Sequence, residues 1–194
     1  MRAVLAAVLL CSGAAAQEVH HARLPVRKLL DDLSVSVTMR WLRPMDDFGT
    51  YWMDAPAVGL EVRKQALPAL ALAAGGALSL LRAADTPRKD RVPDLGLMTL
   101  HVGLRMQYVL TAGITGVGGI GLETQTFAYL GPRARGNLYA RVESEVGVGA
   151  LAGMAVKLNR LPTVELMAGH HVVFTGPEYA RFWSIDANIC VLTL

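Results

Sequence analysis

The stretch Leu95–Leu110 alternates between apolar and polar side chains, and this period of two constrains the fold more than any other feature of the sequence. One set comprises Met98, Leu100, Val102, Leu104, Met106, Tyr108 and Leu110, and the other comprises Thr99, His101, Gly103, Arg105 and Gln107. Because successive side chains of a strand point to opposite faces, the stretch is predicted to be a β-strand with one apolar and one polar face. Two surroundings fit such a strand: a sandwich with its core on the apolar side, or a barrel whose apolar side meets lipid and whose polar side fills the lumen.

The composition favours the barrel. Apolar residues make up 53% of the 194 residues, charged residues make up 18%, and the mean hydropathy is +0.36. No uninterrupted run of about 20 apolar residues follows the N-terminus, so the apolar content is spread over alternating segments instead of transmembrane helices. The net charge of +3 arises from scattered basic and acidic residues, which excludes a basic stripe for nucleic acid.

The N-terminus is predicted to be a signal peptide over residues 1–16. Arg2 supplies the positive charge, Ala3–Leu10 supplies the apolar core, and small alanines precede a cleavage site before Gln17. Residues 17–32 are predicted to be a polar periplasmic leader. Its pair His20-His21 has no carboxylate or cysteine at ligand spacing, so we expect neither a metal nor a cofactor.

Eight strands are predicted in the rest of the chain. They are Leu33–Arg43, Ala57–Lys64, Ala69–Arg82, Leu95–Leu110, Ile114–Leu130, Asn137–Ala150, Thr163–Thr175 and Arg181–Leu194. Ala69–Arg82 is also compatible with a helix because alanine and leucine favour helices, although Gly75-Gly76 weakens that interpretation. Leu151–Pro162 breaks the alternation of long and short connections, which leaves a count of ten strands open.

The signal peptide, the alternating strands and the connections together resemble small outer-membrane β-barrel proteins of Gram-negative bacteria, the OmpA/OmpX-like barrel superfamily. The resemblance implies an all-β fold over residues 33–194, a closed antiparallel up-and-down transmembrane β-barrel in the outer membrane. It also implies contact with outer-membrane lipid and lipopolysaccharide, insertion by the outer-membrane assembly machinery, and a monomeric state. The connections Pro44–Asp54 and Ala83–Asp94 would then be external loops, and Trp41, Trp52 and Trp183 would suit interfacial girdles.

An eight-stranded barrel has a lumen just wide enough to be filled by side chains. The predicted inward-facing charged and histidine residues are Arg40, Glu61, Arg63, His101, Arg105, Glu123, Arg141, Glu143, Glu145, Glu165 and Asp186. Both signs are present, and opposite charges in a confined lumen can pair. The sequence therefore predicts a plugged, ion-paired interior, in which His101 has Glu143 or Glu145 as a candidate partner.

No enzymatic activity is predicted. Barrel enzymes of the deacylase type carry a His-x-Ser arrangement near the outer rim. The nearest match in this sequence, Gly169-His170-His171-Val172, lacks the serine. Ser144 and Ser184 are the plausible nucleophiles on strands, and neither has a diagnostic neighbour in the sequence. The expected function is a structural or surface-interaction role of an outer-membrane barrel. The alternative is a soluble periplasmic β-barrel that carries a lipid or another apolar ligand.

Overall fold

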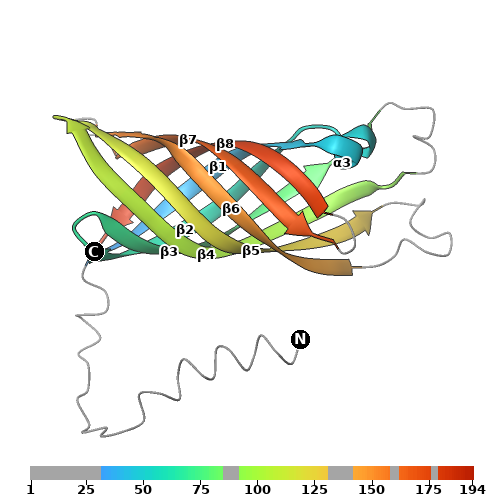
Figure 1. Cartoon of the computed structure of the whole chain (residues 1–194), viewed down its shortest axis with the longest axis horizontal. Helices are drawn as coiled ribbons and strands as arrows, with labels where there is room; N and C mark the ends of the chain where they lie inside the picture. The colour runs from blue at the N-terminus through green and yellow to red at the C-terminus, as the bar shows by residue number, and fades with distance from the viewer. Residues whose placement is uncertain (1–31, 85–91, 131–141, 158–161, 176–178) are drawn as a thin grey trace, which may run out of the picture. The chain divides into compact units, whose positions relative to one another are not determined.

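The computed structural model describes residues 32–84, 92–130, 142–157, 162–175 and 179–194, and their strands form one closed barrel (Figure 1). The elements are β1 (Leu33–Pro44), α3 (Asp46–Tyr51), β2 (Ala55–Leu67), β3 (Leu70–Leu81), β4 (Asp94–Thr111), β5 (Ile114–Leu130), β6 (Val142–Val156), β7 (Val164–Phe174) and β8 (Tyr179–Thr193). Each strand pairs antiparallel with the next along the chain, and β1 pairs antiparallel with β8 to close the ring. The predicted all-β, up-and-down barrel is confirmed.

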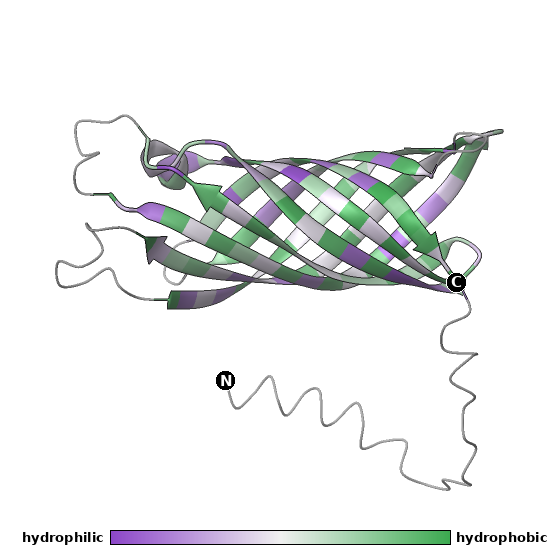
Figure 2. Ribbon diagram, turned by 180° about the vertical axis from the view of Figure 1, so that it is seen from behind, coloured by the Kyte–Doolittle hydropathy of each residue, from purple (hydrophilic) through white to green (hydrophobic). Residues whose placement is uncertain are grey.

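Burial alternates along the strands as the sequence pattern predicts. Ser36, Thr38 and Arg40 of β1 are buried, whereas Met39 and Trp41 between and beyond them are about half exposed, at 56% and 49%. Hydrophobic and hydrophilic residues accordingly alternate along the ribbons in Figure 2. The apolar set faces outward and the polar set faces the lumen, which is the arrangement of a transmembrane barrel and the reverse of a soluble one.

The two ambiguous segments are both strands. The predicted strand Ala69–Arg82 corresponds to β3, and the helical alternative is wrong. Glycine is needed within this strand because the next strand lies very close: a Cβ on Gly75 would lie 2.4 Å from the carbonyl oxygen of Leu60. The segment that begins at Leu151 continues β6 as far as Val156 instead of forming a separate strand. The structure therefore has eight strands in its described residues, and the ten-strand alternative is wrong.

The two ends of the barrel differ in their connections. The turns after β2 and β4 have two residues each, and Gly113 in the second turn has φ +94°, which glycine adopts without steric penalty. The first connection at the opposite end contains α3, a helix that the sequence analysis did not predict. Figure 1 shows α3 at one end and the C-terminus at the other, and we call the first the α3 end. No helix in the described part of the chain is long and apolar enough to cross a membrane.

Apolar side chains close the lumen at the α3 end. Leu42, Leu81, Leu95, Phe127 and Phe182 are buried there, and Phe48 and Trp52 pack against them from the α3 connection. The ring centroids of Phe48 and Phe182 are 5.3 Å apart, and those of Phe48 and Trp52 are 4.4 Å apart. The α3 connection therefore acts as an aromatic cap on the barrel.

Replacing an outward-facing residue at mid-strand by arginine tests whether this surface meets lipid. Val102 lies near the middle of β4 and is 57% exposed. We expect Val102→Arg to lower the free energy of unfolding in lipid vesicles by about 2–4 kcal/mol, since the guanidinium would lie in hydrocarbon. Denaturant titration in vesicles measures the change, with Val102→Leu as the control. A loss within about 0.5 kcal/mol, typical of an ordinary water-exposed site, would contradict a lipid-facing wall.

Candidate functional site

The lumen holds a hydrogen-bonded network centred on Glu61 of β2. Its carboxylate accepts hydrogen bonds from Arg63 Nε at 2.5 Å and from Arg105, and it lies 2.9 Å from His101 Nε2. Glu61 is 1% exposed, and both arginines are buried. One carboxylate therefore links β2 to β4 across the interior and is compensated by two guanidinium groups.

Arg63 extends this network across the barrel to β7. Its two terminal nitrogens donate to the two carboxylate oxygens of Glu165, each at 2.5 Å, and Asn188 Nδ2 donates to Glu165 at 3.4 Å. A bidentate guanidinium–carboxylate pair fixes geometry as well as charge. This pair therefore connects β2 with β7 across the interior of the barrel.

A second group, a single ion pair, lies at the seam where the barrel closes. Arg40 of β1 and Asp186 of β8 are register partners, and Arg40 donates to the carboxylate through Nε at 2.9 Å and through Nη2 at 2.7 Å. Their side chains are 4% and 1% exposed. Removal of either partner would leave the other buried without its hydrogen-bonded counter-charge.

A third group forms a chain of Glu123, His171 and Ser184. His171 Nδ1 lies 2.8 Å from Glu123 Oε1, and His171 Nε2 lies 2.9 Å from Ser184 Oγ. Two glycines make the space: a Cβ on Gly149 would lie 2.3 Å from Glu123 Oε1, and one on Gly169 would lie 2.4 Å from Ser184 Oγ. Ser184 has no diagnostic neighbour in the sequence, and its two partners are brought to it by the fold from β5 and β7.

This Ser–His–Glu order is that of a hydrolase triad, yet its surroundings do not suit hydrolysis. Ser184 is 3% exposed and His171 is 1% exposed, so both side chains are shielded from solvent. The cavity beside Glu123 has a volume of about 20 Å³, roughly the room for one water molecule. The flanking backbone N–H groups are used in strand pairing, which leaves no evident oxyanion hole. We call these three side chains, which join β5, β7 and β8 by hydrogen bonds, the relay.

The structure places most of the predicted lumen residues in these groups. Arg40, Glu61, Arg63, His101, Arg105, Glu123, Glu165 and Asp186 all take part, whereas Arg141 lies outside the described residues. Glu143 is exposed and Glu145 is half-buried, and both line a pocket of about 640 Å³ beside the aromatic cap, together with residues of α3. The suggested pairing of His101 with either is wrong. Glu143 and Glu145 are register partners of Phe127 and Gln125, nearer the α3 end, and His101 pairs with Glu61 instead.

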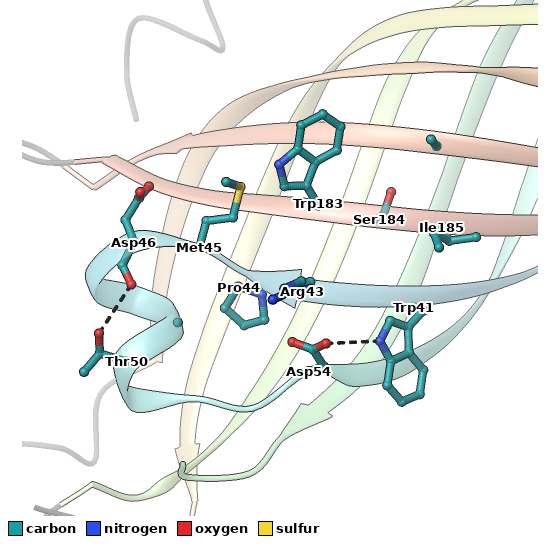
Figure 3. A pocket seen from close by; sticks show the side chains of 12 residues that line it. Trp41, Arg43, Pro44, Met45, Asp46, Thr50, Asp54, Trp183, Ser184 and Ile185 are labelled. Atoms are coloured by element: carbon teal, nitrogen blue, oxygen red, sulfur yellow. Dashed lines mark hydrogen bonds between the residues drawn. The ribbon is translucent and has the colours of Figure 1, made fainter. Parts of the chain in front are cut away.

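The outer surface beside α3 carries an open groove of about 860 Å³ (Figure 3). Trp41 and Trp183 form its walls, Ile185 lies toward the apolar belt, and α3 forms the edge at the barrel end. Both tryptophans face outward and are about half exposed, as expected for an interfacial girdle. Trp52, by contrast, packs into the aromatic cap and donates from Nε1 to the carbonyl oxygen of Pro93 at 3.1 Å.

The described residues contain no group of three or more histidine, cysteine or acidic side chains that could hold a metal ion. His20-His21, which the sequence analysis considered for metal binding, lies outside those residues.

The seam pair gives a stability test. We expect Asp186→Ala to lower the free energy of unfolding by about 3–5 kcal/mol, because Arg40 would remain buried without its counter-charge. The double variant Arg40→Met with Asp186→Leu should recover most of the loss, since it removes both charges and keeps apolar volume. Equal destabilisation by the single and double variants in a denaturant titration would show that the pair is not the source of the effect.

The relay gives a reactivity test. We expect no labelling of Ser184 when the folded barrel in detergent is treated with a fluorophosphonate, because its hydroxyl is buried and is hydrogen-bonded to His171 on the lumen side of the wall. Mass spectrometry of the digested protein measures the label, and Ser184→Ala serves as the matched control. Stoichiometric labelling that disappears in the alanine variant would establish an activated serine.

The comparisons with known proteins agree with this fold. The sequence matches no protein-family model, and a search of curated proteins finds no significant match. Among solved structures, Neisserial surface protein A superposes with a TM-score of 0.60 at 11% identity, over 82% of this chain and 96% of that one. OprG of Pseudomonas aeruginosa has a TM-score of 0.50 at 11% identity, over 82% of this chain and 93% of that one.

A third similar structure is the attachment invasion locus protein Ail of Yersinia pestis, in complex with a heparin analogue. Its TM-score is 0.50 at 12% identity, with 82% of this chain and 97% of that chain covered. At these identities the likeness concerns the fold. The apolar exterior and polar lumen described above fit a location in the Gram-negative outer membrane, as the sequence predicts. The chain therefore has the fold of the eight-stranded outer-membrane β-barrels.

Proposed function

We propose that this chain is an outer-membrane barrel with a side-chain-filled lumen, which acts structurally and through the surface at its α3 end. The interlocked ion pairs of the lumen carry the proposal: Arg63 contacts Glu61 of its own strand and Glu165 across the interior. Such a pair spans the space through which a solute would have to pass. The aromatic cap around Phe48 closes the lumen a second time at the α3 end.

The α3 end of the barrel is proposed to face the outside of the cell. The β1–β2 connection there holds α3, whereas the turns after β2 and β4 at the other end have two residues each. Outer-membrane barrels carry their long connections outside and their short turns in the periplasm. The surface around α3 would then meet lipopolysaccharide or external partners. A closed ring has no free strand edge, which favours a monomer inserted by the outer-membrane assembly machinery.

The alternative, a soluble periplasmic carrier of an apolar ligand, has less support. A carrier needs an apolar interior and a polar exterior, whereas here the charged residues Glu61, Asp186 and Arg105 are buried. Leu78, Leu122 and Ile185 are exposed by 60% or more on the outside. Such exposed apolar side chains would promote aggregation in water, whereas they are favourable in contact with lipid. Catalysis is likewise not proposed, because Ser184 is sealed within the wall.

Electrical recording in planar bilayers tests the proposal. We expect the refolded chain to insert without conductance of porin size, because the Arg63–Glu165 pair and the aromatic cap block the lumen. A general porin in the same bilayer is the positive control, and a heat-dependent shift in gel migration confirms that the barrel is folded. Large, stable single-channel steps from the folded protein would refute the filled lumen.

A further inference from the structure

The pocket of about 640 Å³ beside the aromatic cap is bounded by α3 and by the ends of β5, β6 and β8, and we call it the cap pocket. Its aromatic lining residues are Phe48, Tyr51, Trp52, Phe127, Tyr129 and Tyr179, and its charged ones are Asp46, Asp47, Glu143, Glu145 and Arg181. Four carboxylates against one guanidinium give these residues a formal charge of −3. The cap pocket is therefore both aromatic and strongly acidic.

Most of this negative charge is not neutralised within the described chain. Asp46 accepts a hydrogen bond from Arg181 at 2.5 Å, so that one carboxylate is compensated. Asp47, Glu143 and Glu145 have no hydrogen-bond or ion-pair partner among the residues that the structure describes. Glu143 and Glu145 are alternate residues of β6 and face the same side of the strand, about 7 Å apart at 3.3 Å per residue. Two neighbouring carboxylates without a counter-charge repel each other, and a cation between them would remove the repulsion.

The arrangement of the carboxylates does not suit a metal ion. In the described residues no three acidic, histidine or cysteine side chains converge closely enough to hold one, and this includes the carboxylates of the cap pocket. Phe127 is the register partner of Glu143, so an aromatic ring lies beside the acidic group. A cation that matches this lining is larger than a metal ion and has an apolar body.

A buried amide next to the cap pocket lacks a hydrogen-bond donor. Gln125 is 2% exposed, and its Oε1 has no hydrogen-bond partner. It is the register partner of Glu145, and Phe127 follows it on the inner face of β5, so two lining residues of the pocket adjoin it. Its Nε2 donates at 3.5 Å to Glu123, which lies farther from the α3 end, and Oε1 is left for a donor from the pocket side. An unsatisfied buried acceptor is unfavourable, and a ligand with N–H groups would satisfy it.

The chain itself already holds one organic cation at the edge of this pocket. The guanidinium of Arg181 lies over the ring of Tyr179, with Cζ 5.5 Å from the ring centroid, and it donates to Asp46. An aromatic face and a carboxylate thus hold a planar cation together, by cation–π attraction and a charge-assisted hydrogen bond. The same two kinds of group recur deeper in the pocket, where no side chain of the described residues supplies the cation.

We infer that the cap pocket binds a small organic cation, one that carries N–H donors on an aromatic body, with Glu143 and Glu145 as its counter-charges. The rings that line the pocket would stack on the apolar body of the ligand, and the carboxylates would accept from its N–H groups. That the ligand reaches the pocket from outside the cell rests on the proposed function, whereas the binding chemistry does not.

The test is a calorimetric titration of the refolded mature chain in detergent with benzamidinium, a planar aromatic cation with N–H donors. Benzamide, which has nearly the same shape and no charge, should bind at least about tenfold more weakly, because it loses the charge-assisted contacts. Guanidinium, which keeps the charge and lacks the ring, should also bind about tenfold more weakly.

Single substitutions assign the binding to the pocket. Glu145→Gln and Glu143→Gln should each weaken benzamidinium about tenfold, as the loss of one charge-assisted contact predicts. Asp54→Asn is the matched control, because Asp54 is an exposed carboxylate of the same connection that does not line the cap pocket. At physiological salt its charge is screened from the pocket, and we expect an unchanged affinity.

Several results would overturn the inference. One is the absence of saturable binding, and another is equal binding of benzamide or of guanidinium to the unmodified chain, which needs no variant. Equal affinities of Glu145→Gln, Glu143→Gln and Asp54→Asn would move the binding elsewhere, and calcium binding that the two glutamine variants abolish would assign the carboxylates to a metal. The heat-dependent gel shift shows that each variant is folded. Bilayer conductance tests the filled lumen independently, so the two proposals can fail separately.

Discussion

Closure of the sheet is the constraint on which the rest of this structure depends. A lipid-facing sheet has no water to satisfy an open edge, so the first and last strands must pair, and β1 and β8 do so over most of their lengths. Eight strands in a closed ring enclose a narrow interior, into which the buried charged side chains project. The inward residues must therefore fill that space and satisfy one another's charges and hydrogen bonds.

In the lumen, large charged side chains alternate with glycines around the ring of strands. Long charged side chains from several strands extend into the interior, and glycines on the neighbouring strands leave space for them. A Cβ on Gly119 would lie 2.4 Å from a terminal nitrogen of Arg105, and one on Gly149 would lie within 3.0 Å of both Glu123 and His171. Burying a charge is unfavourable without a counter-charge, and these contacts allow each pair to meet. The glycines are thus part of the electrostatic arrangement as much as of the packing.

The period of two in the sequence was enough to predict the fold and the facing of individual residues. The bounds of β5 agree with the predicted strand Ile114–Leu130, and eight of the predicted lumen residues take part in the buried network. Their partners could not be predicted, because a partner depends on strand register and on which side chains meet across the lumen. Ser184 and His171 are 13 residues apart in the chain, and Glu123 is a further 48 residues from His171. The helix α3 was missed because it has only six residues and no side-chain cap at its N-terminus.

The inside and the outside of the wall are linked by the same alternation. Gly149 faces inward, where a side chain would collide with Glu123, and its neighbours Val148 and Ala150 face outward. Gly103, Gly121 and Gly149 are consecutive register partners on β4, β5 and β6. They also border an apolar hollow of about 680 Å³ on the outer surface of the wall. Where the lumen requires glycine, the wall is only as thick as its backbone, and a small outward residue beside it leaves a depression. Filling the lumen with long polar side chains thereby shapes the surface that the barrel presents to lipid.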